Sequence, residues 1–393
     1  MYRIGINASF LRKPYTGIGQ VTANVLREIS KKDSYVFANK KVDAKDITFF
    51  LYFDSKEESI GFPNAFTKRV PHVFYKRDDL IRKWLFERYA IPHQAKNDAL
   101  DAFISLYQSA TIFSSFSKMF HAMVVHDIIP EVVCGYTDNA RKRFSWRSIK
   151  KGIKKAHRIL SVSKHTEKDL IQKLGISADK ISLALIDVDP IFSEPVSHEK
   201  ISLIKSHYQL PLKYFLYTGG FEVRKNVESL LLAYKQIVDD HDGSENIPHL
   251  VLVGTLLPHL APLVIDVETR IRELKLKNVV HIYENIPQHD MPAFYASSLC
   301  FIFPSTYEGF GMPVLEAMRS GAPVITTKKT SLGEVAGDAA LYCDGTVDGI
   351  ATSMREIIKD EILQNELRRR GILRSQLFSW ERFMERLFAN IRL

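Results

Sequence analysis

The sequence predicts an α/β protein that contains two doubly wound parallel sheets. Short β-rich segments alternate with longer helical patterns along the whole chain, which is the order expected of βαβ units. Several of the short segments are apolar on both faces, as in parallel strands that helices cover on each side. The length of 393 residues is more than one core comfortably accommodates, so two such domains are expected.

Strands and helices are expected in both halves of the chain, in slightly different numbers. In the first half, strands are expected at Arg3–Asn7, Phe49–Phe53, Ala102–Ser105, Met123–His126, Arg158–Val162 and Ile181–Leu185, and helices at Gly19–Lys31, Asp79–Asn97 and Lys164–Leu174. In the second half, strands are expected at Tyr214–Thr218, Leu250–Val253, Val279–Tyr283, Cys300–Phe303 and Pro323–Thr326, and helices at Val227–Asp239, Val264–Leu274, Asp290–Ala296 and Met312–Ser320.

The boundary between the two domains is expected within Asp187–Lys213. This stretch contains three prolines and no strong strand pattern. We therefore expect a first domain over residues 1–190 and a second over residues 191–374. The last helical pattern, Trp380–Leu393, follows the second domain in the sequence without having to belong to it.

The composition is that of an ordinary globular protein, with 46% hydrophobic and 25% charged residues. No apolar run approaches the roughly 20 residues that span a bilayer. The chain begins directly with a strand pattern and not with a signal peptide. Its three cysteines are odd in number and far apart, which favours free thiols over a disulfide framework or a zinc site. We therefore expect a cytoplasmic protein.

The formal net charge of +9 is concentrated in one predicted helix. Over Arg141–Arg158, an apolar stripe of Trp146, Ile149, Ile153 and Ala156 is surrounded by basic residues. Such a helix could lie on an anionic membrane, or its stripe could pack on the protein's own core, and the sequence leaves both interpretations open. Nucleic acid is not an expected partner, because no nucleic-acid-binding motif accompanies the charge.

The most informative segment runs from Glu308 to Glu316, where a Gly-x-Gly turn and a proline separate two carboxylates. A short buried strand precedes it and a short helix from Met312 follows. A glycine turn at a helix N-terminus exposes N–H groups that suit phosphate or hydroxyl oxygens. The two carboxylates could then hold a polyhydroxyl ligand at two places. The same spacing also occurs by chance in ordinary strand-to-helix turns, so the rest of the chain has to decide.

A second glycine turn, Gly219-Gly220, ends the first strand of the second half and is followed by Arg224 and Lys225. Arginine offers a planar fork of donors and lysine a point charge. Together they could neutralise a diphosphate and stabilise it as it leaves. A solvated Arg-Lys pair is the structural alternative, and the adjacent glycines and helix favour the functional interpretation.

Two weaker candidates lie in the first half. Gly17 and Gly19 open the first helix, where a phosphate could approach closely, although a tight turn explains them equally well and the third glycine of a dinucleotide fingerprint is missing. His126 lies at the carboxyl end of a predicted strand. There it could touch the transferred group or assist proton movement, or be a satisfied polar residue.

Two Asp-x-Asp patterns look like the metal-binding motif of another class of sugar-transferring enzymes. They are Asp187 with Asp189 and Asp240 with Asp242. Neither pair has a nearby histidine or a third carboxylate that would complete a ligand set. We interpret both as solvated loop acids, and no metal site is expected.

Together these motifs resemble the retaining glycosyltransferases of family four, which have the GT-B fold. The likeness extends nearly from end to end and includes Ser161-Val162-Ser163, Ser320–Val324 and Ser379-Trp380-Glu381. It implies two Rossmann-like domains that face each other across a cleft, with residues 375–393 crossing back to pack on the first domain. The first domain would mainly bind the acceptor and the second the nucleotide diphosphate-sugar.

The resemblance also implies roles for single residues in the second domain. Arg224 and Lys225 would hold the diphosphate beside the glycine turn at Gly219-Gly220. Glu316 would bind the ribose hydroxyls. Glu308, together with the backbone of Phe310 and Gly311, would orient the donor sugar.

In the first domain, the Gly17–Gly19 loop would approach the phosphates and His126 would contact the donor sugar. Similar enzymes need no divalent metal and no other cofactor. They keep the anomeric configuration, with the leaving phosphate helping to deprotonate the acceptor. The chain departs from the pattern at Gln20, where relatives often have a basic residue, and at Ile186-Asp187-Val188, where many have Asn-Gly-Val.

The opening Asn7-Ala8, with Gly17 and Gly19 after it, resembles bacterial mannosyltransferases that build O-antigen and other surface polysaccharides. This implies GDP-mannose as donor and a glycan or lipid-linked oligosaccharide as acceptor. The basic helix at Arg141–Arg158 would hold the enzyme at the inner face of the cytoplasmic membrane. The alternatives are a UDP-sugar transferase or a nucleotide-sugar epimerase of the same fold. From other classes, they are a nucleotide-dependent oxidoreductase or a nucleic-acid-binding protein.

Overall fold

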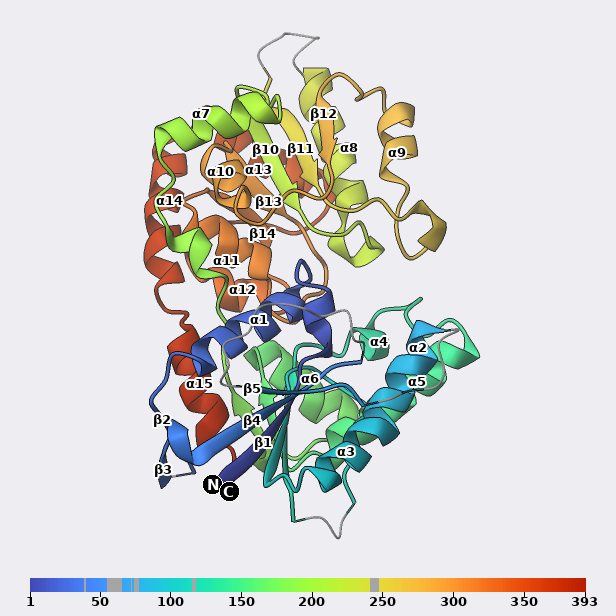
Figure 1. The fold of residues 1–393 in the computed structure, drawn as a ribbon. Helices are drawn as coiled ribbons and strands as arrows, with labels where there is room; N and C mark the ends of the chain where they lie inside the picture. Colours follow the sequence, from blue (N-terminus) through green and yellow to red (C-terminus); the bar gives the residue numbers. More distant parts are fainter. Residues whose placement is uncertain (39, 55–65, 72, 74–77, 115–117, 241–246) are drawn as a thin grey trace. The chain divides into compact units, whose positions relative to one another are not determined.

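The computed structural model describes residues 1–393 except 39, 55–65, 72, 74–77, 115–117 and 241–246 (Figure 1). Its internal contacts divide the chain into two compact units. The N-terminal unit comprises Met1–Asp187 and Phe378–Leu393, and the C-terminal unit comprises Val188–Leu377. The boundaries expected after residues 190 and 374 lie within a few residues of these.

The N-terminal unit contains a seven-stranded parallel sheet in the order β5-β4-β1-β6-β7-β8-β9. The strands are β1 (Tyr2–Asn7), β4 (Ile47–Tyr52), β5 (Phe66–Arg69), β6 (Ala102–Ser105), β7 (Phe120–Val125), β8 (Arg158–Ser161) and β9 (Ile181–Leu183). The chain first adds strands on one side of β1 and then crosses to add β6 on the other. The switch point of this sheet, where α/β proteins bind ligands, therefore lies between β1 and β6.

The helices of the N-terminal unit follow the expected order with one interruption. They are η1 (Ser9–Arg12), α1 (Gly17–Ile29), η2 (Ala44–Asp46), α2 (Asp79–Leu85), η3 (Phe86–Ala90), α3 (Ile91–Asn97), α4 (Ile129–Val132), α5 (Ala140–Lys155), α6 (Lys164–Leu174) and η4 (Ala178–Lys180). The single helix expected at Asp79–Asn97 is wrong in detail, because the π-helical segment η3 separates α2 from α3. Pro92, at the start of α3, lacks the N–H that a continuous α-helix would use there.

The last helix, α15 (Trp380–Ala389), packs on the N-terminal unit against α1 and the hairpin of β2 (Ser34–Phe37) and β3 (Lys40–Asp43) (Figure 1). The ring of Phe388 lies 4.7 Å from that of Tyr35, 5.0 Å from that of Phe37 and 6.3 Å from that of Phe49, measured between centroids. This aromatic cluster connects the end of the chain to the β2–β3 hairpin and to β4.

The basic helix α5 buries its apolar stripe within its own unit. Trp146, Ile153 and Ala156 belong to a core cluster with residues of β7 and α6, and Ile149 packs against that cluster. The stripe is therefore part of the protein core, and the basic residues of α5 remain at the surface together with Phe144. Among the described residues, no helix is long and apolar enough to cross a membrane.

The C-terminal unit contains a six-stranded parallel sheet in the order β12-β11-β10-β13-β14-β15. The strands are β10 (Tyr214–Thr218), β11 (His249–Val253), β12 (Val280–Tyr283), β13 (Cys300–Phe303), β14 (Val324–Thr327) and β15 (Leu341–Cys343). The helices are η5 (Pro190–Ser193), α7 (His198–His207), η6 (Val223–Lys225), α8 (Val227–Asp240), η7 (Pro258–Leu260), α9 (Val267–Glu273), α10 (Met291–Ala296), α11 (Met312–Arg319), α12 (Leu332–Ala336), α13 (Val347–Lys359) and α14 (Glu361–Ser375). Here the switch point lies between β10 and β13.

Candidate functional site

Four of the predicted site residues lie at the switch point of the C-terminal sheet. Arg224 and Lys225 follow β10, Glu308 follows β13, and Glu316 lies in α11. Since β10 and β13 are adjacent parallel strands, their carboxyl ends meet at the same edge. The topology alone therefore brings the basic pair and Glu308, some eighty residues later in the chain, to one place.

Glu308 is the centre of this cluster. Its Oε1 lies 2.7 Å from Lys225 Nζ and accepts hydrogen bonds from Arg224 Nη1 at 2.8 Å and from Ser305 Oγ at 2.8 Å. The residue is only 8% exposed. One carboxylate oxygen thus receives two cations and a hydroxyl inside the protein, so the basic pair and Glu308 form a single cluster.

Burial and charge oppose each other at this site. Burial by itself would raise the pKa of Glu308, but Lys225, Arg224 and the hydrogen bonds outweigh it and lower that pKa below its usual value. For Lys225, burial and the neighbouring Arg224 lower the pKa, while Glu308 counteracts them. The positive charges of Arg224 and Lys225 face two carboxylates, that of Glu308 and that of Glu222 at 3.7 Å from Arg224 Nη2, so the charges balance within the cluster.

Backbone contacts hold the two loops of the cluster together. Arg224 Nη1 also donates to the carbonyl oxygen of Tyr307 at 3.0 Å, and the carbonyl oxygen of Arg224 accepts from the N–H of Thr306 at 2.7 Å. The ammonium group of Lys225 lies 4.7 Å from the centroid of the Phe303 ring. Side chain and main chain are therefore both fixed before any ligand arrives.

The turn at Gly309–Gly311 has the conformation that the sequence predicted for a helix start. Gly311 caps α11 with φ of 108°, and a Cβ atom added there would lie 2.6 Å from Leu332 Cδ2. A residue other than glycine would be strained at this φ and would also clash. Ser331 Oγ lies 2.8 Å from the carbonyl oxygen of Phe310 and 3.0 Å from that of Glu308, which keeps the turn in place.

Glu316 is connected to the turn at Gly219-Gly220 through Tyr295, which the sequence did not predict as a site residue. Its Oε2 accepts a hydrogen bond from the hydroxyl of Tyr295 at 2.8 Å. That hydroxyl lies 2.7 Å from Thr218 Oγ1, at the end of β10 and directly before Gly219. The three residues are all less than a tenth exposed. Glu316 therefore lies against the same strand end as the basic pair.

The turn after β10 is closely packed. Gly219 has φ of 134°, and its carbonyl oxygen lies only 2.0 Å from the position of a Cβ added to Gly254. The carbonyl oxygen of Gly220 accepts from the hydroxyl of Tyr217 at 2.5 Å. Tyr217 and Ser305, like Tyr295, support the site without having been predicted. A polar residue beside the end of a buried strand is the signal that could have indicated Ser305.

The remaining predicted residues belong to the N-terminal unit. Gly17 begins α1, and a Cβ added to Gly19 would lie 2.0 Å from the carbonyl oxygen of Lys13, so the loop requires a glycine there. His126 follows β7, with Nε2 at 2.9 Å from the carbonyl oxygen of Leu106. Burial lowers the pKa of His126 to about 4, so its ring is neutral near pH 7. The approach of these residues to the donor remains a prediction.

The Asp-x-Asp patterns have ordinary structural partners. Asp189 Oδ1 accepts from the N–H of Ile191 at 3.1 Å and caps η5, and Asp240 pairs with Arg355 at 2.7 Å. The interpretation of Asp187 as a solvated acid is wrong, because it is 5% exposed at the end of the N-terminal unit. Asp242 lies outside the described residues. Among those described, no group of three histidine, cysteine or acidic side chains could hold a metal ion.

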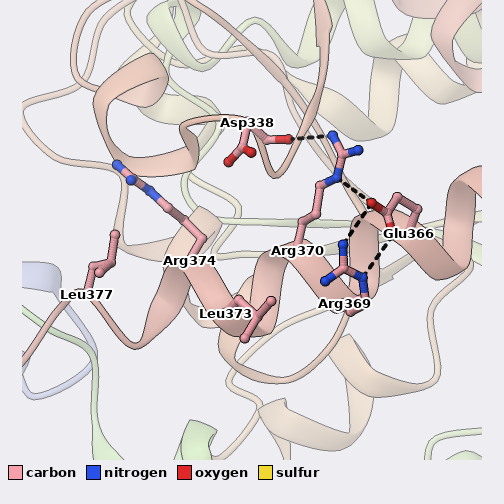
Figure 2. A pocket seen from close by; sticks show the side chains of 7 residues that line it. All are labelled: Asp338, Glu366, Arg369, Arg370, Leu373, Arg374 and Leu377. Atoms are coloured by element: carbon pink, nitrogen blue, oxygen red, sulfur yellow. Dashed lines mark hydrogen bonds and ion pairs between the residues drawn. The ribbon is translucent and has the colours of Figure 1, made fainter.

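A separate hollow of about 500 Å³ lies on the surface of the C-terminal unit between α14 and the end of α12 (Figure 2). In it, Arg369 and Arg370 both bind Glu366. It is lined by Asp338, Glu366, Arg369, Arg370, Leu373, Arg374 and Leu377. None of the predicted site residues belongs to it.

The two parallel sheets and the buried cluster of Arg224, Lys225 and Glu308 are those expected of a glycosyltransferase, and comparison with known proteins supports this class. Residues 204–374 match the family model of the glycosyl transferases group 1. The chain is 29% identical to O-antigen chain mannosyltransferase B of Escherichia coli over 94% of each chain.

Solved structures show the same fold. Sucrose-phosphate synthase of Thermosynechococcus elongatus matches with a TM-score of 0.73 and 16% identity, over 98% of this chain and 96% of that one. HepE of Anabaena, in complex with UDP and glucose, matches with a TM-score of 0.72 and 18% identity over 96% of each chain.

The chain is therefore an enzyme of the glycosyltransferase class with the GT-B fold. More particularly, its C-terminal unit matches the group 1 glycosyltransferases, and the chain as a whole is similar to mannosyltransferases of O-antigen biosynthesis. Both the fold and the family predicted from the sequence are confirmed. The alternatives of an epimerase, an oxidoreductase and a nucleic-acid-binding protein are set aside, and the UDP-sugar transferase remains.

Proposed function

We propose that this enzyme is a retaining, metal-independent mannosyltransferase. It moves mannose from GDP-mannose to a glycan or lipid-linked oligosaccharide during the synthesis of a cell-surface polysaccharide. The contact of Glu308 with both Arg224 and Lys225 carries the proposal. It supports a site in which two buried cations receive a diphosphate and an acid oriented by these cations faces the sugar.

In this mechanism the two cations bind the diphosphate of the donor and stabilise the negative charge that develops as the sugar–phosphate bond breaks. They supply the charge that a divalent ion supplies in other transferases. Glu316 binds the ribose hydroxyls from its place beside Thr218. Glu308 and the backbone at Phe310 and Gly311 orient the sugar, and the leaving phosphate takes the proton of the acceptor hydroxyl.

The N-terminal unit supplies the acceptor site in this proposal. The loop at Gly17–Gly19 approaches the phosphates and the neutral ring of His126 contacts the sugar. With a pKa of about 4, His126 is a hydrogen-bonding group near pH 7 and not a proton donor.

Mannose is supported by the names of the relatives, which include O-antigen chain mannosyltransferases of two bacteria, and GDP is the donor nucleotide that the family resemblance implies. The UDP-sugar alternative is supported by HepE, which has the same fold and binds UDP. Calorimetric titration of the enzyme with GDP and with UDP distinguishes them. We expect GDP to bind at least tenfold more tightly, and a preference for UDP would end the mannose proposal.

The proposed location is the cytoplasm, at the inner face of the membrane, with the basic face of α5 toward anionic lipid. Phe144 on α5 is 52% exposed, and its ring lies 5.1 Å from that of Trp84 on α2. An exposed aromatic ring such as that of Phe144 among basic side chains suits the membrane interface. Sedimentation with vesicles tests this. Binding to anionic vesicles should be lost in Arg147→Glu/Lys151→Glu and should not occur with neutral vesicles, whereas equal sedimentation of both proteins would refute it.

A further inference from the structure

The N-terminal unit has a cationic cluster of its own at the switch point of its sheet. Asn7 ends β1, and its Nδ2 donates to the hydroxyl of Tyr107 at 2.9 Å, just after β6. The ammonium group of Lys83, from α2, lies 4.5 Å from the centroid of the Tyr107 ring and 4.5 Å from that of Phe10. Lys83 therefore lies at the edge of the sheet where β1 and β6 separate.

This arrangement repeats the one in the C-terminal unit. There, Lys225 lies over the ring of Phe303 and beside the buried Glu308. Here, Lys83 lies over two rings, and its Nζ is 3.7 Å from Oε1 of Glu87, whose side chain is 2% exposed. In both units, a lysine at the switch point thus lies over aromatic rings and next to a buried glutamate.

Two arginines complete the cluster. Arg12 Nη2 and Arg82 Nη2 lie 3.3 Å and 3.7 Å from Oδ2 of Asp54, whose side chain is fully buried. Neither oxygen of Asp54 has a hydrogen-bond partner among the described residues, and the Nε of Arg82 has none either. Distances above 3.2 Å are ion pairs without well-formed hydrogen bonds. Among the described residues, the Nε of Arg82 therefore donates to no acceptor, whereas its Nη2 also pairs with Asp79 at 3.1 Å.

Exposure shows which ends of the cluster a ligand would meet. The side chains of Arg12, Arg82 and Lys83 are 23%, 20% and 25% exposed, whereas that of Asp54 is not exposed at all. Burial lowers the pKa of Lys83, and Arg12 and Lys13 lower it further, against Glu87 and Asp54. Asp54 and Glu87 are thus buried, the three cations are partly exposed, and Asp79 beside Arg82 is exposed. A bound anion would relieve the repulsion of Lys83 by Arg12 and Lys13.

We propose that Arg12, Arg82 and Lys83 form a phosphate-binding subsite that holds a phosphate group carried by the acceptor. Two arginine forks and a lysine from two separate elements suit the several oxygens of a phosphate better than a single carboxylate. This rests on the proposed function, in which the N-terminal unit binds the acceptor. The inference extends that proposal by naming the acceptor class as a glycan attached through a phosphate or diphosphate ester.

Equilibrium dialysis of the full chain with radiolabelled inorganic phosphate, at constant ionic strength and in saturating GDP, tests the subsite. GDP occupies the site of Arg224 and Lys225, so we expect one further saturable phosphate per chain. Lys83→Met and Arg12→Gln should each weaken its binding at least tenfold. Lys205→Met is the control, since Lys205 also lies near a ring, that of Tyr214 at 5.8 Å, but on the C-terminal unit.

Other results of the dialysis would overturn the subsite or its assignment to the acceptor. Absence of saturable phosphate binding in the GDP-loaded enzyme, or equal binding in both variants, would overturn the proposal, because the cations would then serve the donor or nothing. Methyl phosphate should compete for the site with an affinity within tenfold of that of inorganic phosphate. If methyl phosphate does not compete, the site binds only free phosphate, and the acceptor assignment is overturned. Because Lys83 also neutralises Glu87, Arg12→Gln keeps the test valid if Lys83→Met fails to fold.

The nucleotide titration separates this inference from the proposed function. Binding of GDP without the additional phosphate would remove the subsite and leave the transferase proposal intact. If neither GDP nor UDP binds, the transferase proposal fails, and dialysis of Lys225→Ala without nucleotide still measures the subsite.

Discussion

Lys225 Nζ lies 2.7 Å from Glu308 Oε1 in the interior of the C-terminal unit, and the two residues come from loops that follow adjacent parallel strands. The contact neutralises a buried acid and places a buried cation where a diphosphate would bind. Each partner depends on the other, because an unpaired charge at such a depth is costly. The arrangement makes the lysine both a binding group and a structural one.

Replacing Lys225 with alanine should lower turnover by a factor of about a hundred or more, since the leaving diphosphate loses a preorganised positive charge. Arg224 still pairs with Glu308 at 2.8 Å, so we expect the variant to remain folded, with a loss of about 1–3 kcal/mol in the free energy of unfolding. Turnover is measured by sugar transfer and folding by circular dichroism. Lys205→Ala is the matched control, and near-normal turnover of Lys225→Ala would exclude the proposed role.

Glu316→Ala should weaken nucleotide binding by about ten- to a hundredfold, which corresponds to the loss of hydrogen bonds to a charged group. Tyr295→Phe removes only the hydroxyl that connects Glu316 to Thr218. We expect a smaller loss in that variant, because the carboxylate remains but is less well positioned. Calorimetry with the nucleotide measures both, with Glu268→Ala on the exposed face of α9 as control. An unchanged affinity in Glu316→Ala would contradict the ribose role.

Much of this site could be predicted from local sequence. The strands Tyr214–Thr218 and Cys300–Phe303 have the expected bounds, because short apolar runs between turns identify buried parallel strands. Strand ends at one edge then imply that Arg224, Lys225 and Glu308 meet. The contact of Glu316 with Tyr295 could not be foreseen, because it depends on how α10 packs against α11.

Elements that depend on long-range packing were not predicted. The β2–β3 hairpin is held by Phe388, which lies more than three hundred residues later in the chain. Helix α14 lacks an apolar stripe. It packs through Gly371 against Met318, and Arg368 donates a hydrogen bond to the carbonyl oxygen of Gly321. A helix held by a glycine contact and an arginine leaves no periodic signal in the sequence.

Removal of divalent ions should leave the rate of transfer unchanged. In the proposed mechanism, Arg224 and Lys225 supply the positive charge at the diphosphate, so that no step needs a metal. Activity is compared after dialysis against a chelator and after addition of magnesium or manganese. A loss of activity that added metal restores would require a ligand set beyond Asp187 and Asp189.

Buried neutral histidines should make the enzyme less stable in mild acid. The pKa of His121 is lowered to about 3 by burial and by His157, and the pKa of His126 is lowered to about 4 by burial. At pH values between these lowered pKa values and the ordinary histidine pKa of 6.5, the unfolded chain binds protons that the folded chain does not bind. The stabilisation is therefore complete above about pH 6.5 and is lost as the pH falls.

The slope of stability against pH isolates this effect from the other consequences of a substitution. His121 Nε2 lies 3.0 Å from Ser105 Oγ, so His121→Gln will itself lower stability at every pH. Between pH 6.5 and 4.5, however, its free energy of unfolding should fall less steeply than that of the wild type, by up to about 1 kcal/mol per pH unit. Urea unfolding at several pH values measures both slopes, and the exposed His198→Gln should retain the wild-type slope. If His121→Gln retained it as well, His121 would have to take up its proton in the folded enzyme, and the buried ring would not be the origin of the acid sensitivity.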